Sequence, residues 1–217
     1  MKNVIFISAP ASGKGTYSNM LKERCGYIHI STGDLLRNIV KENSDLGKEV
    51  AEVLSKGNLV EDELMFKIIK EKLVNLNKEK SFILDGIPRT LNQAEYLDKL
   101  LKELNCDDYC VIYLNIDYEI ALKRALGRLS CLNCGASYNK LFDNFKPKKE
   151  NICDKCGNEL ISRTDDNEES FKQRFENYES NTLPILEYYE NSNKLTKIDV
   201  QNFTNEQIFD IIINVVK

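Results

Sequence analysis

Four cysteines have the spacing of a metal site. They form two Cys-x2-Cys pairs eighteen residues apart, each followed by a glycine: Cys131, Cys134, Cys153 and Cys156. Thiolates at this spacing make the tetrahedral cage that zinc prefers, and the glycines permit tight turns that bring backbone N–H groups toward the sulfurs. Because the set has no histidine and no open ligand position, we expect a structural zinc rather than a catalytic one. Iron is a weaker candidate for the same cage.

A second chemically capable segment is a loop of small residues, SAPASGKGT, from Ser8 to Thr16. It lies between the apolar run Val4–Ile7 and a segment with helical spacing. Backbone N–H groups at a helix N-terminus face an anion, and Lys14 adds a charge, so the loop predicts a phosphate site. In the generic pattern GxxxxGK[ST], Ser8 replaces the first glycine and Gly15 the hydroxyl residue. A strand–helix turn with a solvated lysine is the alternative interpretation.

Arginine is the minority cation in this chain. Among 30 cationic residues there are seven arginines, at positions 24, 37, 89, 124, 128, 163 and 174. The planar guanidinium can grip two phosphate oxygens at once, which a lysine cannot do. Apart from Arg24, these arginines lie in the motifs described below, and solvated surface arginines are the alternative.

The composition limits the class of protein. The 217 residues carry a net charge of −4 and are 42% hydrophobic, enough for one sizeable domain with small insertions. The negative charge argues against a nucleic-acid binder, and the short apolar runs argue against a membrane span or signal peptide. An odd cysteine count without an export signal indicates a cytoplasmic protein without a disulfide framework, in which Cys25, Cys106 and Cys110 are inert thiols.

Strand-like and helix-like segments alternate along the chain, which predicts an α/β fold with a parallel sheet of about five strands and helices on both faces. The expected strands are residues 4–7, 27–30, 81–85, 110–114 and 194–200. The expected helices, besides the one that follows the phosphate loop, are residues 34–56 with a break near Asn43–Leu46, 61–76, 91–104, 118–126, 168–189 and 206–216. Ser31 and Thr32 form an expected helix cap. From Gly127 to about Arg163 the composition shifts to Cys, Asn, Gly, Lys and Pro, which indicates an insertion.

The order of these motifs resembles the adenylate kinase family, of the type with a long zinc-binding lid, over essentially the whole chain. The resemblance rests on APASGKGT, HISTGDLLR, GNLV, LDGIPRTLNQA and the cysteine-bearing insertion before R-x-DDNEE. It implies a core of residues 1–30, 61–126 and 164–217, a helical AMP-binding insertion at 31–60 and a lid at 127–163. The implied reaction is reversible phosphoryl transfer, ATP + AMP = 2 ADP, by a monomer.

The resemblance also assigns roles to individual residues. The implied AMP site consists of Thr32, Arg37, Asn58, Leu59, Val60, Gly86, Ile87, Pro88, Arg89, Gln93, Arg163 and Arg174. The implied ATP site consists of Ala11, Ser12, Gly13, Lys14, Gly15, Thr16, Arg124, Arg128, Ser137, Tyr138 and Asn202. The implied catalytic set is Lys14, Asp85, Arg89, Arg124, Arg128, Arg163 and Arg174, with Asp85 holding Mg²⁺ through its water shell. Asp165 and Asp166 fall in a stretch that the family uses as a lid hinge.

Some positions depart from the family pattern, and some alternatives stay open. Where the family has GxPGxGKGT, Ser8 and Ala11 each replace a glycine, and either residue is strained if its position needs a positive φ. His29, the single histidine, is expected to be a packed side chain. The alternative functions are another nucleoside monophosphate kinase such as a GTP:AMP phosphotransferase, a zinc-ribbon nucleic-acid-binding ATPase, and a non-catalytic nucleotide-binding scaffold.

Overall fold

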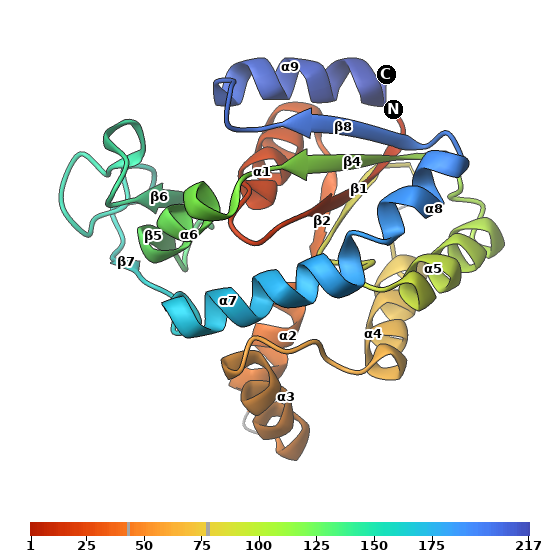
Figure 1. The fold of residues 1–217 in the computed structure, drawn as a ribbon, viewed down its shortest axis with the longest axis horizontal. Coiled ribbons are helices and arrows are strands. Elements are labelled where there is room, and N and C mark those ends of the chain that lie inside the picture. Colours follow the sequence, from red (N-terminus) through yellow and green to blue (C-terminus); the bar gives the residue numbers. More distant parts are fainter. Residues whose placement is uncertain (43, 77–78) are drawn as a thin grey trace.

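The computed structural model describes residues 1–42, 44–76 and 79–217. A parallel sheet lies at its centre, with strand order β2-β3-β1-β4-β8 (Figure 1). The strands are β1 (Asn3–Ser8), β2 (Ile28–Ser31), β3 (Phe82–Asp85), β4 (Tyr109–Asn115) and β8 (Leu195–Asp199). The central strands β1 and β4 are almost entirely buried, as expected for a sheet covered on both faces. The predicted five-stranded parallel sheet is confirmed.

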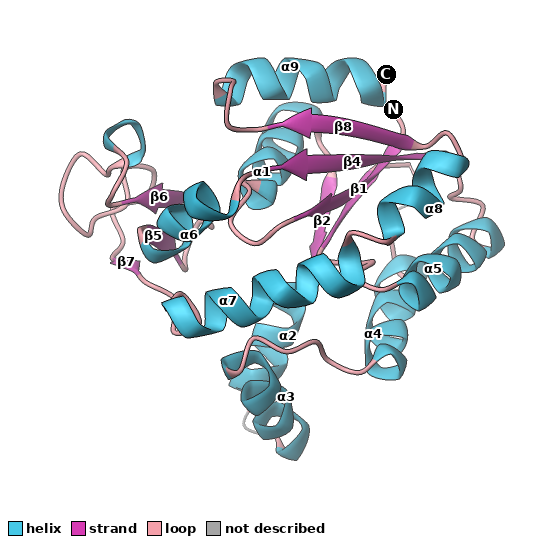
Figure 2. Cartoon of the chain, in the orientation of Figure 1, coloured by secondary structure: helices cyan, strands magenta, loops and turns pink. Residues whose placement is uncertain are grey.

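Helices cover the sheet, and the ribbon coloured by secondary structure shows them on both sides of it (Figure 2). The helices around the sheet are α1 (Lys14–Cys25), α4 (Asp62–Val74), α5 (Leu91–Glu103), α6 (Tyr118–Leu126), α7 (Glu168–Asn177), α8 (Ile185–Asn191) and α9 (Asn205–Val216). Arg24, the arginine outside the motifs, joins α1 to α9, because its guanidinium donates to both carboxylate oxygens of Glu206 at 2.6 and 2.7 Å.

The register of the strands brings the candidate site residues to one edge of the sheet. Asp85, the last residue of β3, pairs with Phe6 of β1 and with Ser31 of β2. The phosphate loop after β1 and the helix start after β2 therefore emerge beside Asp85. Ligands of open parallel sheets bind at this carboxyl edge.

Two further helices, α2 (Thr32–Lys41) and α3 (Asp45–Ser55), extend away from the sheet at the bottom of Figure 1. Ser31 caps α2 by accepting a hydrogen bond from the Asp34 N–H at 3.2 Å, as the sequence predicts. The predicted break between these helices is present, although Asn43, within it, lies outside the described residues.

The cysteine-bearing segment forms a separate antiparallel sheet of three strands, β5 (Arg128–Cys131), β6 (Ser137–Asn139) and β7 (Leu160–Ile161), in the order β6-β5-β7. A 3-10 turn, η1, spans Asp143–Phe145. We call this segment the lid. Its buried cluster consists only of Leu129, Cys131, Ala136, Cys153 and Leu160. Such a small apolar core cannot stabilise a lid by itself, and two of its five members are cysteines of the predicted metal site.

The prediction of one helix over residues 168–189 is wrong in detail. The helical path breaks into α7, a π-helical turn η2 (Tyr178–Thr182) and α8. In the π turn the N–H of Leu183 donates to the carbonyl of Tyr178, five residues back, at 3.0 Å. Pro184 follows and has no N–H to continue the ladder. Side-chain periodicity does not detect such a change of hydrogen-bonding pattern.

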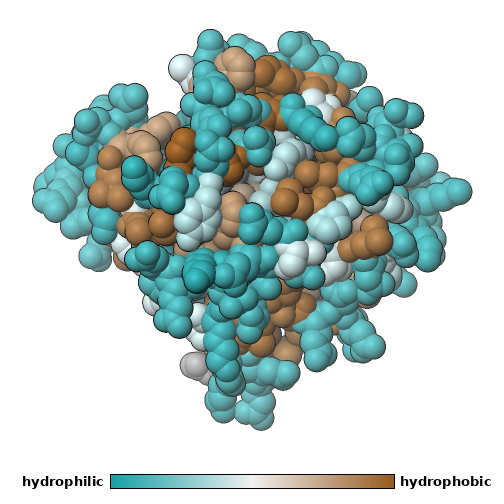
Figure 3. Space-filling view, viewed as in Figure 1, coloured by the Kyte–Doolittle hydropathy of each residue, from teal (hydrophilic) through white to brown (hydrophobic). Residues whose placement is uncertain are grey.

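Hydrophilic residues cover most of the face shown in the space-filling view, including the lid and α3, and apolar residues show mainly near its middle (Figure 3). Within the part of the chain that the structure describes, no helix has the length and apolar character needed to span a membrane.

Candidate active site

The phosphate loop connects β1 to α1, and its backbone is set by two residues with positive φ. Gly13, at φ 103°, precedes the first residue of α1, Lys14. Ala11 has φ 60°, a left-handed conformation that costs an alanine about 1 kcal/mol or more. Ser8 ends β1 and is not among the residues with positive φ. The predicted strain therefore applies to Ala11 and not to Ser8.

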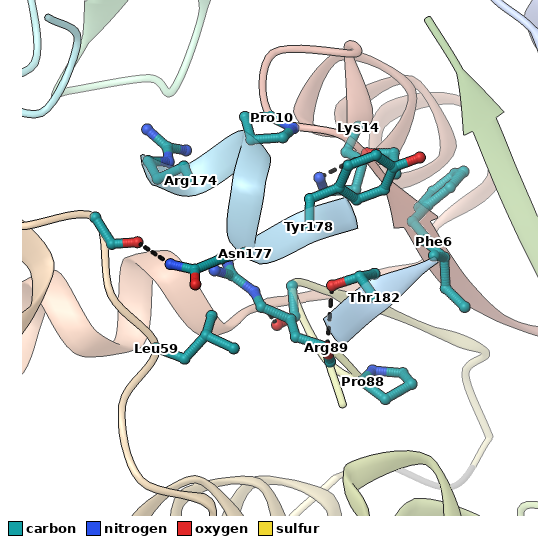
Figure 4. A pocket seen from close by; sticks show the side chains of 14 residues that line it. Phe6, Pro10, Lys14, Leu59, Pro88, Arg89, Arg174, Asn177, Tyr178 and Thr182 are labelled. Carbon is teal, nitrogen blue, oxygen red and sulfur yellow. Dashed lines mark hydrogen bonds between the residues drawn. The ribbon is translucent and has the colours of Figure 1, made fainter. Parts of the chain in front are cut away.

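Lys14 extends its partly buried side chain into the space beside this loop, where its ammonium donates to the hydroxyl of Ser8 at 2.7 Å (Figure 4). Burial lowers the pKa of Lys14 to about 8, against the opposing charge of Asp85 and with the help of Arg89, Arg174 and Arg128. A lysine that is poorly solvated and surrounded by arginines forms a region of concentrated positive charge, which favours binding of an anion.

Two pockets adjoin each other at the carboxyl edge of the sheet. The first contains Lys14 and the loop residues Ser8 and Pro10. The second contains Thr32, Arg37 and Gln93. Both are lined by Gly57, Leu59, Gly86, Arg89 and Arg174. We call them the lysine pocket and the glutamine pocket. The two shared arginines lie where the contents of one pocket would meet the contents of the other.

The glutamine pocket brings together most of the residues predicted to bind AMP. Its lining includes Thr32, Arg37, Asn58, Leu59, Val60, Gly86, Arg89, Gln93 and Arg174. Pro88 lines the lysine pocket instead. Ile87 is fully buried in the core and lines neither pocket, so its side chain is not available to a ligand. Arg163 is also absent from both linings.

Close backbone approach at Gly86 fixes the turn after β3. Gly86 has φ 91°, and a Cβ added to it would lie 2.3 Å from the hydroxyl of Thr32. Its carbonyl accepts a hydrogen bond from Nε of Arg89 at 2.8 Å. Thr182, in the π-helical turn, donates to the carbonyl of Arg89 at 3.0 Å (Figure 4). Arg89 is therefore held from both its side chain and its backbone, facing the boundary between the pockets.

The side-chain amide of Gln93 is buried and fixed in one orientation. Its Oε1 accepts from the N–H of Arg89 at 2.8 Å, and its Nε2 donates to Oδ1 of Asp62 at 2.6 Å. A carboxylate can only accept and a backbone N–H can only donate, so the two partners define which end of the amide is which. One N–H and one oxygen lone pair of Gln93 remain for a ligand.

Asp85 is held as a carboxylate near the lysine pocket. Burial by itself would raise the pKa of Asp85, but the hydrogen bond with His29 and the charges of Lys14 and Arg89 lower it below its ordinary value. Nε2 of His29 lies 3.3 Å from Oδ2 of Asp85. His29 is therefore more than the packed side chain that the sequence suggested, because it holds this carboxylate in place.

Two acidic residues between the lid and α7 hold arginines in ion pairs. Arg128, in the first strand of the lid, pairs through Nε and Nη2 with Asp166, and the Nε distance is 2.8 Å. Arg174, on α7, donates to Asp165 at 2.9 Å. Burial lowers the pKa of Arg174 to about 10, and burial with the charges of Arg128 and Arg37 lowers that of Arg163 to about 10. With these pKa values, Arg163 and Arg174 stay charged at neutral pH.

The remaining residues predicted to bind ATP lie on the loop side and on the lid. Arg124 donates to the carbonyls of Ser12 and Val200 at 3.5 Å, which places it between the phosphate loop and the turn that contains Asn202. Ser137 and Tyr138 lie on β6 of the lid. The hydroxyl of Tyr138 accepts from the N–H of Asp154 at 2.8 Å, so the phenol points into the cysteine cluster.

The four cysteines of the lid converge as their spacing predicts. Their sulfurs all lie within 4.8 Å of one another, with Cys131 and Cys156 at 3.4 Å and Cys134 and Cys153 at 3.5 Å. These separations are too long for disulfides and close to those of four thiolates around one zinc ion. Side-chain donors face two of the sulfurs: Asn158 Nδ2 lies 3.3 Å from Cys156, and the Tyr138 hydroxyl 3.6 Å from Cys153. The donor set fits a tetrahedral metal ion.

Comparison with known proteins identifies the family. The family profile described as adenylate kinase matches residues 6–194. The chain belongs to the adenylate kinase family. An adenylate kinase of Archaeoglobus fulgidus is 45% identical over 197 residues, which cover 91% of this chain and 90% of the relative. One of Thermosipho melanesiensis is 44% identical over 91% of each chain, and one of Bacillus licheniformis is 42% identical over 96% of this chain and 95% of the relative.

Membership in the adenylate kinase family makes the chain a phosphotransferase acting on nucleoside monophosphates.

The sequence analysis did not predict every residue that lines the site. Leu36, Leu54 and Met65 line the glutamine pocket with apolar side chains. Their signal in the sequence was the apolar periodicity of the helical segments, which indicates burial but not which partner is covered. Asp62 and Asn177 were also missed. Asn177 donates to the Gly57 carbonyl at 3.0 Å and ties α7 to the segment after α3.

Proposed function

We propose that this protein catalyses reversible transfer of a phosphoryl group between ATP and AMP, giving two ADP. The observation that carries the proposal is the pair of adjoining pockets with Arg89 and Arg174 in both linings. One pocket holds the lysine of the phosphate loop, and the other holds a buried amide suited to a purine base. Two nucleotides bound in them would meet at the shared arginines.

The residues of the lysine pocket supply positive charge for the donor phosphates. Lys14 and the N–H groups at the start of α1 bind the β- and γ-phosphates, and Arg124, Arg128, Arg163 and Arg174 surround the transferring group. Phosphoryl transfer requires in-line alignment and neutralisation of charge, and little covalent chemistry from the protein. An oxygen of the acceptor phosphate is itself a nucleophile, so no general base is required. Asp85 would hold Mg²⁺ through its water shell, and the ion would supply further positive charge to the donor phosphates when ATP is bound.

The glutamine pocket selects the acceptor base through Gln93. With its amide fixed by Arg89 and Asp62, Gln93 offers one donor and one acceptor to a ligand. Adenine presents an amino donor beside a ring-nitrogen acceptor and can satisfy both, whereas guanine has a carbonyl in place of the amino group. Arg37 and Arg89 bind the phosphate of AMP, and the backbone at Asn58–Val60 and Thr32 complete the site.

The lid closes over the donor side, and we assign it a structural zinc held by its four cysteines. Ser137 and Tyr138 approach ATP from the lid, and Asn202 approaches the donor base. Closure excludes water, which limits hydrolysis when no acceptor is present. One chain lines both pockets, so a monomer is sufficient for the reaction. We place this monomer in the cytoplasm.

A coupled assay of the purified protein tests the function directly. With Mg²⁺, ATP and AMP the protein should form ADP, and with ADP alone it should form ATP and AMP. GMP and UMP should be poor acceptors, because a carbonyl in place of the amino group leaves a polar group unpaired in the closed pocket, at a cost of about 1–3 kcal/mol. CMP should also be a poor acceptor, because its single ring leaves part of a purine pocket unfilled. Lys14→Ala should lower turnover by orders of magnitude.

The outcomes also separate the alternatives. A preference for another monophosphate, or for GTP as donor, would retain the kinase and overturn the adenylate assignment. ATP binding without transfer to any monophosphate would favour a nucleotide-binding scaffold. Binding of oligonucleotide but not AMP would favour the nucleic-acid-binding ATPase.

A further inference from the structure

Ser8 occupies the position at which the generic phosphate loop has a glycine, and its side chain lies at the centre of a small buried network. Its hydroxyl donates to the carbonyl of Ala9 at 2.9 Å. It accepts from the hydroxyl of Ser12 at 2.6 Å and from the ammonium of Lys14 at 2.7 Å. Ser8 is 9% exposed and Ser12 is 1% exposed, so water contributes little to this network.

The direction of these hydrogen bonds matters for Lys14. A hydroxyl has one proton, and that of Ser8 is directed to Ala9, which leaves its oxygen as an acceptor for the lysine. An acceptor on the ammonium stabilises the protonated form of a lysine. The charged groups that act on Lys14 are Asp85, which favours protonation, and Arg89, Arg174 and Arg128, which oppose it. Ser8 is therefore the neutral partner that holds the ammonium among groups of mostly like charge.

We propose that Ser8 is a positioning residue for phosphoryl transfer: its hydroxyl holds Lys14 protonated and aimed into the lysine pocket until the phosphates of ATP replace it as partner. A glycine at this position has no atom that could do so. The proposal rests on the proposed function for its activity readout, and concerns how this chain prepares Lys14 rather than which reaction it catalyses.

The test compares Ser8→Ala and Ser8→Gly with Ser8→Thr, which keeps a hydroxyl and suits the end of a strand. The control is Ser18→Ala. Ser18 is fully buried on α1, and its hydroxyl has no hydrogen-bond partner among the described residues, so this variant removes a buried hydroxyl from the same helix without removing a hydrogen bond from Lys14. Thermal unfolding of each variant checks that it is folded. If the alanine variant is unstable, the glycine variant, which has the residue of the generic loop, also lacks the hydroxyl and replaces it in the comparison.

The main readout is the pH profile of kcat/KM for ATP, which reports ionisations of the free enzyme. In the unmodified protein it should decline as pH rises through about 8, where Lys14 loses its proton. Without the Ser8 hydroxyl this alkaline limb should move to lower pH by about one pH unit, as expected for loss of a hydrogen bond to a charged group. The protonated fraction of Lys14 at pH 8, and with it kcat/KM for ATP, should then fall roughly fivefold. The limb of kcat should move less, because phosphate oxygens then contact Lys14.

Ser8→Thr should restore the profile and Ser18→Ala should leave it unchanged. A profile for Ser8→Ala or Ser8→Gly that coincides with the unmodified protein's overturns the proposal, as does a threonine variant that behaves like alanine. Calorimetric titration with a non-hydrolysable ATP analogue across the same pH range repeats the comparison without turnover. If the unmodified protein forms no ADP, the proposed function fails, and the binding titration still tests Ser8.

Discussion

At the scale of single residues, the site depends on partners that fix the direction of a polar group. Gln93, Arg89 and Lys14 are each held by a hydrogen bond with a residue to which the proposed reaction assigns no substrate contact: Asp62, Thr182 and Ser8. A buried polar group with assigned partners presents the same donor or acceptor in every molecule, and this constancy is what recognition requires.

Asp62→Asn should reduce the preference for AMP. An asparagine can turn either its oxygen or its nitrogen toward Gln93, so the amide of Gln93 loses one of the two contacts that define its orientation. We expect kcat/KM for AMP to fall about tenfold and the ratio of GMP to AMP turnover to rise. Steady-state kinetics with both acceptors measure this change.

Asn92→Ala is the matched control for that variant. Asn92 donates to the other carboxylate oxygen of Asp62 at 2.7 Å and is exposed. Its removal leaves the Asp62–Gln93 contact in place, so the acceptor preference should not change. Equal selectivity in Asp62→Asn and the unmodified protein would show that Arg89 alone orients the amide.

Ala11→Gly should relieve the strain at φ 60° in the phosphate loop. The gain is reduced by the greater flexibility of glycine in the unfolded chain, so the free energy of unfolding should rise by no more than about 1 kcal/mol. Affinity for ATP should stay the same or increase. Ala11→Val should lower both, since a β-branched residue is poorly tolerated at positive φ. Chemical denaturation and calorimetry measure the two quantities, and a stable valine variant would contradict the strain.

At the scale of secondary-structure elements, the junction between lid and core depends on a buried ion pair. Asp166 is 2% exposed and Arg128 is 16% exposed, so their pair joins the first strand of the lid to the segment before α7 largely out of water. Other lid–core contacts are exposed, such as Lys155 with Glu23 at 2.8 Å. The two kinds of pair should differ strongly in their contribution to stability.

Asp166→Ala should lower the free energy of unfolding by about 3–5 kcal/mol, because it leaves a buried guanidinium without its partner. Glu23→Ala, which breaks the exposed pair, should change it by less than about 1 kcal/mol. Urea denaturation of the two variants compares them on one scale. Similar small losses for both would mean that Arg128 finds water or another carboxylate, such as Asp165, when Asp166 is removed.

At the scale of the whole molecule, the lid and the sheet domain have different sources of stability. The core around the parallel sheet contains most of the buried apolar residues, and the lid has a cluster of five. The division of the chain into core, AMP-binding insertion and lid, with boundaries at residues 30, 60, 126 and 163, stays a prediction. Removal of the metal tests whether the lid unfolds separately from the core.

Chelation should unfold the lid before the core. We expect elemental analysis to find one zinc ion per chain, and its removal to add a low-temperature unfolding transition while that of the core remains. Cys153→Ser should have the same effect. Cys106→Ser should not, because Cys106 lies outside the cluster, in the segment between α5 and β4. Iron in place of zinc would change the identity of the metal but keep its role in stabilising the lid. Protein purified without either metal would contradict the predicted metal site.

The sequence by itself determined the features that depend on short stretches of chain. Apolar runs predicted the strands of the parallel sheet, the loop before Lys14 predicted a helix start able to bind phosphate, and two Cys-x2-Cys pairs predicted the cysteine cluster. These signals are local because hydrogen bonding within a helix, burial of a strand and metal chelation by a tight turn require few residues.

Only the tertiary structure decided which polar groups face one another. Asp62 meets Gln93 across 31 positions and Asp166 meets Arg128 across 38. It also decided that Ser8 stays in the strand while Ala11 takes the strained conformation, and that His29 contacts Asp85. Pairings of this kind depend on how distant segments pack, and residue type alone leaves several partners open to each side chain. The strand register, which pairs Asp85 with Phe6 and Ser31, is the physical reason that the phosphate loop and the residues after β2 meet at this edge of the sheet.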